Sequence, residues 1–510
     1  MSDGTDFRLI YVRRPWAVPR GLHPEIDECA DLLAREQAQD FLSGMPILVT
    51  PDWRVDFQLA EFFYGLEFGS FPASTQSTYA IEIKTWCRFL ERRGGLHWTE
   101  ADEDDFAAFK RWRTDGRLNP DAVTEATWIK AVAALRRLYQ WAGSARRQFV
   151  VGSPIPGSSG STRVRQGASP TRPAAVTSQR VRWITPATFR LWLDVGMRGY
   201  DPQPRHEGGF ESGLRDPGFR GRNTQRNCAY AHLVYNSALR RQEIGTLLTT
   251  ELPELDQTDV RLARAVTKGR KVRHWRAFGD GLADTSAYIE QTRAEAVARA
   301  RAAGRYQHLA HARWVTAVEH HRSKGASFVF SDGSIAAVGS LDAEERMNLF
   351  TTLRDGRPEP LMVWLREDGM PQQPQGWNKV FETANGRVAA RFSAIGHASR
   401  TVVLSPHSLR FSYALFVLAA LHRALDRKNG WAASDPYEEN RYLQAYTIVQ
   451  DLLGHIDVRT TKETYLQPLQ GLRGQALLEE ASDDIHAALA ALATHDPRVL
   501  DITGGRRGTN

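Results

Sequence analysis

The chain has 510 residues, 42% of them hydrophobic, and its Lys and Arg residues outnumber Asp and Glu by 66 to 59. This composition excludes a wholly disordered chain and allows two or three domains with a substantial core. No segment reaches the roughly 18–20 apolar residues that a membrane helix needs, and the N-terminal sequence MSDGTDFRLIYVRRPW lacks the apolar stretch of a signal peptide. We therefore expect a cytoplasmic protein with no membrane partner.

The formal net charge of +7 is compatible with a polyanionic partner, although many basic proteins bind no nucleic acid. The cysteines Cys29, Cys87 and Cys228 are scattered and have no CxxC spacing. Each is expected to pack as a small hydrophobic residue in a reducing compartment.

The first part of the chain is predicted to be helical. Residues 1–51 carry weak signals and are treated as an N-terminal extension, and residues 52–146 are predicted to form a small all-helical domain. Its first helix stops at Gly94-Gly95, its second begins after Thr99, where acidic residues suit the positive end of a helix, and its third spans 124–142. The apolar face of the first helix is formed by Tyr79, Ile83, Trp86, Cys87 and Leu90.

Residues 147–182 are predicted to be a flexible linker. From residue 143 to residue 182 the chain holds seven arginines, no Asp or Glu, and many Gly, Ser and Pro, which cannot bury a core. The segment is either a solvated tether or a strap that follows a phosphate backbone. In the second case the DNA-binding residues would be Arg163, Arg165, Arg172, Arg180 and Arg182.

Residues 183–496 are predicted to form a second, mostly helical domain, followed by a tail at 497–510. A helix begins at Thr185-Pro186, with Thr as its cap and Pro in its first turn. Further elements are expected in chain order as follows: a Gly/Pro-rich surface loop at 199–224, a helix ending in Arg240, a β-hairpin at 260–278 with its turn at TKGR, one or two charged helices at 281–323, irregular chain with short strands at 328–380, an apolar helix around 411–421 and an amphipathic helix at 475–493.

Six residues of this second domain suit the cleavage of a phosphodiester. Arginine presents a planar, permanently charged fork that fits phosphate oxygens, and a tyrosine can act as nucleophile if a base or an electropositive setting overcomes its pKa of about 10. In chain order the set is Arg240, Lys268, His407, Arg410, His455 and Tyr465.

These motifs resemble those of the tyrosine recombinase, or phage integrase, family over roughly residues 60–495. ALRRQE at 238–243 follows the family pattern G-L-R-x-x-E, HSLR at 407–410 follows H-x-x-R, LLGH ends at His455, and Tyr465 is the last tyrosine of the chain. The resemblance implies a mainly α fold, with a helical core-binding (SAM-like) domain and a mostly helical catalytic domain that contains a small antiparallel β-sheet.

The resemblance also implies the roles of the residues. Tyr465 would form a 3′-phosphotyrosyl link, so that no cofactor is needed, and Lys268 would protonate the leaving 5′-oxygen. Arg240 and Arg410 would hold the non-bridging oxygens of the phosphate. His407 and His455 would complete the set, and Glu243 would orient its neighbours.

Several residues compete with this assignment. Arg241 is an immediate rival of Arg240, Lys271 of Lys268, and the H-x-x-R spacing also occurs at His397/Arg400 and His495/Arg498. Only the middle motif reads H-x-L-R and leads into an apolar helix. The chain also departs from the family pattern, with ten positions from His455 to Tyr465 instead of nine, Phe411 where a histidine is common, and inserted sequence at 199–224, 281–380 and 425–440.

The resulting hypothesis is a site-specific DNA recombinase or integrase of a mobile genetic element, nucleoid-associated in a bacterium. It would act on double-stranded DNA as a homotetramer without a metal, and the helix at 475–493 would dock on a neighbouring protomer or pack within its own chain. The alternatives are a type IB topoisomerase-like enzyme, a hairpin-resolving enzyme, and a DNA-binding regulator of the same fold without strand-transfer activity.

Overall fold

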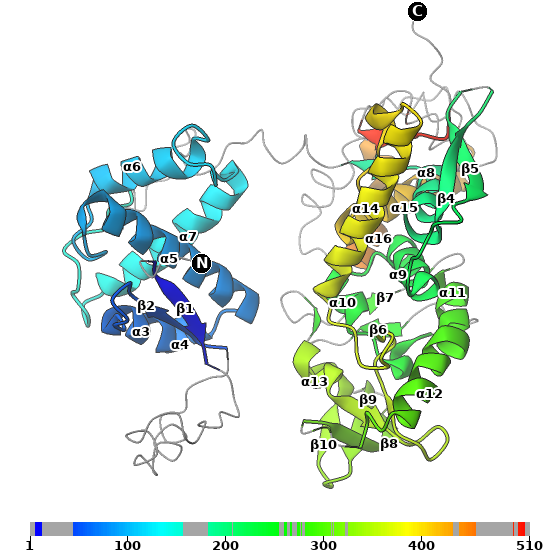
Figure 1. The fold of residues 1–510 in the computed structure, drawn as a ribbon, viewed down its shortest axis with the longest axis horizontal. Helices are drawn as coiled ribbons and strands as arrows, with labels where there is room; N and C mark the ends of the chain where they lie inside the picture. Colours follow the sequence, from blue (N-terminus) through cyan, green and yellow to red (C-terminus); the bar gives the residue numbers. More distant parts are fainter. Residues whose placement is uncertain are drawn as a thin grey trace, which may run out of the picture. The chain divides into compact units, whose positions relative to one another are not determined.

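The chain divides into two compact units, Met1–Val176 and Thr177–Asn510, which are described separately. The computed structural model describes residues 6–12, 44–156, 182–206, 208–253, 260–262, 266–267, 273–275, 277, 281–307, 309, 311–321, 325–431, 438–454, 493 and 498–504 (Figure 1). None of the helices in these ranges combines the length and the apolar character needed to cross a lipid bilayer.

The first unit is a helical bundle with a two-stranded sheet at its side. Its elements are β1 (Arg8–Tyr11), β2 (Pro46–Val49), α3 (Phe57–Tyr64), α4 (Leu66–Gly69), α5 (Ala73–Gly94), α6 (Glu103–Thr114) and α7 (Glu125–Ala142). The three helices predicted from the sequence are α5, α6 and α7. The strands β1 and β2 pair antiparallel and contact α5, so part of the expected N-terminal extension belongs to this unit.

The boundaries of these helices follow from their caps. α5 ends where Gly95 adopts a left-handed conformation with φ of 71°, which costs glycine little. α6 begins at Asp102, whose carboxylate accepts from the amide of Asp105 at 2.9 Å in a capping box. The expected acidic start of this helix and the Gly-Gly stop of the preceding helix are both confirmed.

A buried hydrogen-bond chain joins α5 to α7 through the hydroxyl of Tyr139. This hydroxyl accepts from Nε1 of Trp86 at 2.9 Å and donates to the carbonyl of Trp98 at 2.6 Å. Burial raises the pKa of Tyr139, so the phenol stays protonated and can act as donor.

The first helix of the second unit is α8 (Pro186–Leu193), which is capped by Thr185 as predicted and is followed by a π-helical turn at Asp194–Arg198. The prediction of a surface loop at 199–224 is wrong, because β4 (Tyr200–Pro204) and β5 (Phe210–Arg215) form an antiparallel hairpin there. Arg387 and Arg391 from a distant helix form ion pairs with Asp216 that tie the segment down.

The helix predicted to end in Arg240 ends earlier. α9 spans Thr224–Ser237, Ala238 takes a left-handed conformation with φ of 54°, and Arg240 caps the short helix α10 (Arg241–Gly245). The antiparallel pairing predicted within 260–278 is confirmed for β6 (Val260–Leu262) and β7 (Arg273–Trp275), whereas most of the predicted turn at 267–270 lies outside the described residues.

The next segment holds a larger sheet than expected. The helices expected at 281–323 are confirmed only as far as residue 302, by α11 (Gly281–Tyr288), a π-helical turn (Ile289–Arg293) and α12 (Ala294–Ala302). The strand β8 (Arg313–His321) follows, and it contains the aromatic and β-branched residues that favour strands. β8 joins β9 (Gly325–Phe330), β10 (Ile335–Ala337), β11 (Leu349–Thr351) and β12 (Glu359–Pro360) in the order β10-β9-β8-β11-β12, and only β8 with β11 is parallel. This sheet lies at the opposite end of the unit from the β4–β5 hairpin (Figure 1).

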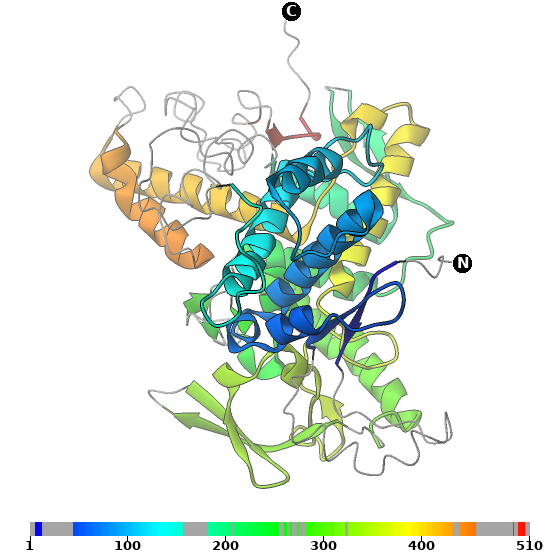
Figure 2. The ribbon, with the colours of Figure 1, turned by 90° about the vertical axis from the view of Figure 1, so that its left-hand side faces the viewer.

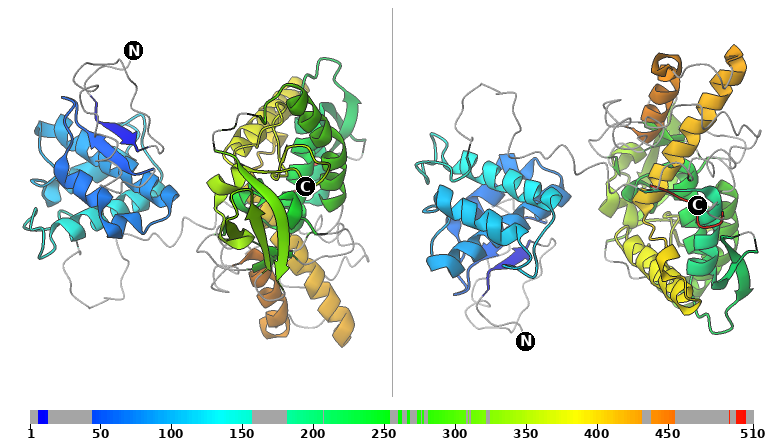
Figure 3. Two further views of the ribbon diagram at one scale, coloured as in Figure 1. Left: turned by 90° about the horizontal axis from the view of Figure 1, so that it is seen from below. Right: turned by 90° about the horizontal axis from the view of Figure 1, so that it is seen from above.

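The remaining elements are mainly helical: α13 (Ala343–Met347), α14 (Gly376–Ala394), α15 (Pro406–Asn429) and α16 (Leu443–Leu453). α15 and α16, drawn in orange tones, lie side by side and project from the rest of the unit (Figures 2 and 3). β13 (Val499–Leu500) pairs in parallel with β3 (Trp183–Ile184), which ties the expected tail to the start of the unit. The predicted fold class, mainly α with small sheets, is confirmed.

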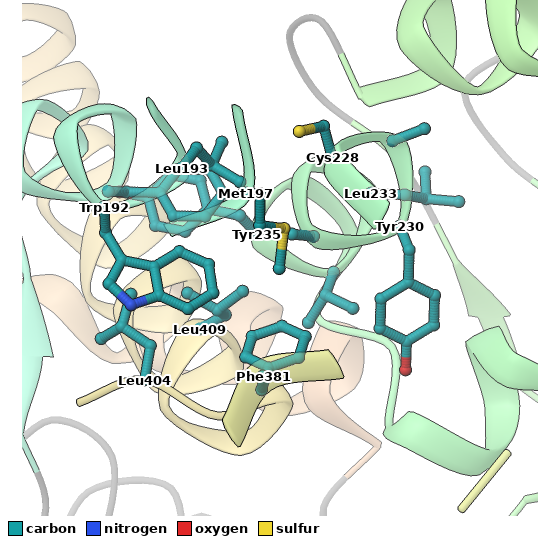
Figure 4. Packing of buried hydrophobic residues seen from close by; sticks show 14 of the residues in the cluster. Trp192, Leu193, Met197, Cys228, Tyr230, Leu233, Tyr235, Phe381, Leu404 and Leu409 are labelled. Atoms are coloured by element: carbon teal, nitrogen blue, oxygen red, sulfur yellow. The ribbon is translucent and has the colours of Figure 1, made fainter. Parts of the chain in front are cut away.

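The main core of the second unit lies between α8, α9 and α14 (Figure 4). The rings of Trp192 and Phe381 stack at 5.3 Å, and those of Tyr230 and Trp377 at 3.6 Å. Leu409 of α15, fully buried, reaches the same core. The end of α9 and the start of α15, which carry the candidate site, are therefore fixed by one packed core.

Tyr139→Phe should destabilise the first unit by about 1–3 kcal/mol, because it leaves the Trp86 N–H and the Trp98 carbonyl without a buried partner. Amide hydrogen exchange in α5 and α7 should become faster. Tyr79→Phe, in which a half-buried ring packs on Phe71, is the control and should change exchange less. Equal exchange in the wild type and in Tyr139→Phe would contradict this role of the hydroxyl.

Candidate active site

Arg240 is held at the start of α10 by the carboxylate of Glu243. The backbone amide of Arg240 donates to Oε2 of Glu243 at 2.7 Å, and its Nη1 donates to Oε1 at 2.9 Å. The side chain of Glu243 is 1% exposed and that of Arg240 is 26% exposed. One buried acid therefore fixes both the backbone and the guanidinium of a partly exposed arginine.

His407 and Arg410 lie one turn apart at the start of α15. The helix begins at Ser405, whose hydroxyl accepts from the amide of Ser408 at 3.2 Å, and Pro406 occupies the first turn. His407 is exposed and its ring packs edge to face on Phe411 at 4.5 Å. Arg410 is fully buried, with Nη1 donating to the carbonyl of Ala238 and Nη2 to the carbonyl of Leu453.

The carbonyl of Leu453 brings the two arginines together. It accepts from Nη2 of Arg240 at 3.4 Å as well as from Nη2 of Arg410. Leu453 is the last residue of α16, where helix carbonyls lack intrahelical donors and the helix dipole is negative, and Gly454 follows with φ of 62°. Two guanidinium groups, one from the N-cap of α10 and one from α15, thus converge on one oxygen atom.

A buried polar cluster packs Tyr442, the residue before α16, against α15. The ring of His422 stacks on Tyr442 at 4.1 Å, and the Tyr442 hydroxyl donates to Oδ1 of Asp426 at 2.7 Å. Burial lowers the pKa of His422 to about 4 and raises the pKa of Asp426. At neutral pH the imidazole is therefore uncharged within this interface.

Lys268, His455 and Tyr465 lie outside the described residues, as do Lys271 and four of the five linker arginines, Arg163, Arg165, Arg172 and Arg180. In the chain, Lys268 lies between β6 and β7, and His455 follows Gly454 directly. Of the described elements around them, β7 contacts α16.

The rival arginines and histidines have other contacts. Nη1 of Arg241 donates to Oδ1 of Asn378 at 2.7 Å, the ring of His397 packs on Phe210 at 5.0 Å, and the guanidinium of Arg498 lies 5.5 Å from the ring of Trp183. Among the described residues, the partner that shares an acceptor with Arg240 is Arg410.

Sequence reasoning missed the acceptors at the centre of this arrangement, because the carbonyls of Ala238 and Leu453 belong to the main chain and leave no side-chain motif. A cavity of about 420 Å³ lies elsewhere in the unit, lined in part by Thr249, Ser286, Arg293 and Arg354, and includes neither arginine of the pair. Within the described ranges, no group of His, Cys, Asp and Glu side chains is arranged to hold a metal ion.

Part of the first unit is similar to a known sequence family. Residues 67–146 match the phage integrase N-terminal SAM-like domain. The resemblance to the tyrosine recombinase family is thereby confirmed for this domain, which includes α5, α6 and α7. No curated protein matches the chain.

Three solved structures, two recombinases and one integrase, are similar to most of this chain at low sequence identity. XerA recombinase is 11% identical, with 86% of this chain and 98% of that chain covered at a TM-score of 0.28. The Tn1549 transposon integrase in complex with circular intermediate DNA is 10% identical, with 78% of this chain and 91% of that chain covered at a TM-score of 0.38. XerH site-specific recombinase bound to difH is 12% identical, with 81% of this chain and 80% of that chain covered at a TM-score of 0.36.

The pairing of α15 with α16 should weaken as the pH falls from about 6.5 towards 4. The pKa of His422 is lower in the folded chain than in the unfolded chain. Its contribution to the free energy of unfolding is therefore complete above the unfolded pKa. It is lost as the pH falls, because the unfolded chain binds a proton at His422 before the folded chain does. The loss should reach about 3 kcal/mol. Urea unfolding at pH 7 and pH 4.5 would measure it.

His422→Phe is the matched control, because a phenyl ring can keep the stack on Tyr442 and cannot titrate. The variant should lose less stability than the wild type between the two pH values. The same loss in both proteins would show that His422 is not responsible.

Proposed function

We propose that this chain is a site-specific DNA recombinase or integrase that cuts and rejoins double-stranded DNA through a 3′-phosphotyrosyl intermediate at Tyr465. The observation that carries the proposal is the convergence of Arg240 and Arg410 on a single oxygen atom. The SAM-like domain in residues 67–146 supports it independently. In this proposal residues 52–146 and 183–496 bind the DNA, and the second of these segments carries the chemistry.

The two arginines suit a phosphate because they already place charged donors around one acceptor. A non-bridging oxygen of a scissile phosphate would replace the carbonyl oxygen of Leu453 and carry more negative charge than it. That charge grows in the transition state, where donors fixed in advance stabilise it most. The exchange requires the Leu453 carbonyl to turn away, and Gly454 supplies the backbone freedom next to it.

The reaction follows from the roles proposed for the remaining residues. The phenolate of Tyr465 attacks phosphorus, the bond to the 5′-oxygen breaks, and Lys268 supplies the proton that the leaving oxygen takes up. The covalent link conserves the energy of the phosphodiester, so a 5′-hydroxyl from a second duplex can reverse the step and join new strands. His407 and His455 contact the phosphate, and Glu243 orients Arg240.

Strand exchange between two duplexes requires four active sites, so the proposed working form is a homotetramer on DNA. The helix predicted at 475–493 is the proposed contact between neighbouring protomers. We also propose that the protein acts in the cytoplasm, associated with the nucleoid of a bacterium, and that it serves a mobile genetic element. The chemistry proposed here uses no cofactor.

The complete burial of Arg410 favours a second candidate function. With both of its Nη groups on main-chain carbonyls, Arg410 can serve simply to cap α16. The chain would then be a DNA-binding regulator with the same fold and no strand-transfer activity. The presence or absence of a covalent adduct separates the two candidates.

Arg240→Ala should abolish covalent adduct formation on nicked suicide substrates while leaving most of the DNA affinity, because it removes a phosphate ligand and not the binding surface. Arg241→Ala is the matched control, since this neighbour binds Asn378 and should keep its activity. Adduct yields on denaturing gels and affinities from gel shifts would measure both effects. Normal cleavage by Arg240→Ala would exclude this arginine from the site.

Replacing Arg163, Arg165, Arg172, Arg180 and Arg182 by Gln should weaken binding to DNA of any sequence if the linker follows the backbone. Each lost phosphate contact should reduce the slope of log K against log salt concentration by about 0.9. Binding titrations at several salt concentrations would give the slope. An unchanged slope would make the linker a tether.

A further inference from the structure

Arg346 of α13 is a charged side chain buried next to the segment that follows α10. It is fully buried, and its guanidinium forms a bidentate pair with Glu251 at 2.6 and 2.8 Å. Its nitrogen atoms also donate to three main-chain carbonyls, those of Leu341 at 3.0 Å, Val338 at 3.1 Å and Thr246 at 3.0 Å. Both charges are thus fully engaged inside the protein.

The pair fixes the chain immediately after α10. Oε2 of Glu251 also accepts from the amide of Leu248 at 3.1 Å, and the Arg346 bond to the Thr246 carbonyl reaches the residue that ends α10. The hydroxyl of Thr246 in turn donates to the carbonyl of Gln242 at 2.8 Å. Arg346 is therefore linked to α10 through one intervening residue.

A second set of bonds holds the same segment from the side of residues 361–364. The amide of Thr249 donates to the carbonyl of Leu361 at 2.8 Å, and the amide of Val363 donates to the carbonyl of Leu247 at 2.9 Å. Nε1 of Trp364 donates to the carbonyl of Ile244 at 2.7 Å. Figure 1 shows α10 on the side of the unit where α13 and the large sheet lie.

The length of α10 makes these contacts important for the candidate site. The helix has five residues, Arg240 caps its first turn and Thr246 ends it, so a shift at one end is transmitted to the other. A buried ion pair adds little net stability over apolar residues of similar volume, because desolvation offsets the attraction. The pair instead fixes the position of the main chain at Thr246 and Leu248, and through α10 that of Arg240.

We propose that Arg346 and Glu251 are positioning residues that hold α10 so that the Arg240 guanidinium points at the reacting phosphate. Neither residue touches the phosphate, and each acts through Thr246, Leu248 and α10. The role of this pair in catalysis rests on the proposed function, whereas its effect on the position of Arg240 does not.

The test compares Arg346→Met with Arg301→Met. Arg301 is the matched control, because it also forms a bidentate pair, with Asp355 at 2.7 and 3.1 Å, and binds the carbonyls of Pro358 and Arg357, away from α10. The first readout is the rate at which phenylglyoxal modifies Arg240 in the folded, DNA-free protein, measured by mass spectrometry. Arg346→Met should raise this rate several-fold, and Arg301→Met should leave it unchanged.

An unchanged rate at Arg240 in Arg346→Met would overturn the proposal, as would an equal increase in both variants, which would indicate general loosening. If Arg346→Met does not fold, the same measurement on Glu251→Gln decides, since this change keeps the shape of the side chain and removes its charge. This readout needs no enzyme activity.

The second readout is strand cleavage. On DNA that the wild type cleaves, Arg346→Met should lower the rate of adduct formation at saturating DNA by about 10- to 100-fold and leave the DNA affinity unchanged, as expected from a misplaced reacting group. Equal losses of rate and affinity would overturn the positioning role. If the wild type forms no adduct, the recombinase proposal fails, and the modification rate of Arg240 still decides whether the pair positions it.

Discussion

The candidate site depends on one main-chain oxygen, the carbonyl of Leu453 at the end of α16. A terminal helix carbonyl needs a donor from elsewhere, and here the donors are two arginines that come from a loop after α9 and from α15. The need to satisfy this acceptor explains why residues distant in the sequence lie together. The same need makes the site receptive to an anionic oxygen, because the donors are charged and the acceptor they hold is neutral.

Buried acids and a packed core keep the two arginines in place. Glu243 binds the guanidinium of Arg240, and Glu251 and Arg346 hold the chain that follows α10. Leu409, the residue before Arg410, packs in the main core. Burying such charges costs free energy unless every donor has an acceptor, and these groups are paired. Ion pairs thus orient the arginine side chains and α10, whereas apolar packing fills the core beneath them.

Local signals predicted the parts of the fold that depend on neighbouring residues. The helix starts near Asp102 and at Thr185, and the stop at Gly95, follow from capping chemistry and are confirmed. The hairpin at 200–215 was missed, since its order depends on ion pairs with α14, far along the chain, rather than on its own Gly- and Pro-rich sequence. The Arg346–Glu251 pair joins residues 95 positions apart, and no local pattern marks it. The roles of Lys268, His455 and Tyr465 remain predictions from the resemblance to the tyrosine recombinase family.

The most direct test of the central claim is the identity of the residue that becomes attached to DNA. Nicked suicide substrates drawn from the DNA flanking the gene would trap the covalent complex, and peptide mapping after nuclease digestion would locate the remaining nucleotide. The account predicts a 3′-phosphate linked to Tyr465 and no adduct with Tyr465→Phe. Tight binding to a cognate site without any adduct, or attachment through a residue other than Tyr465, would contradict it.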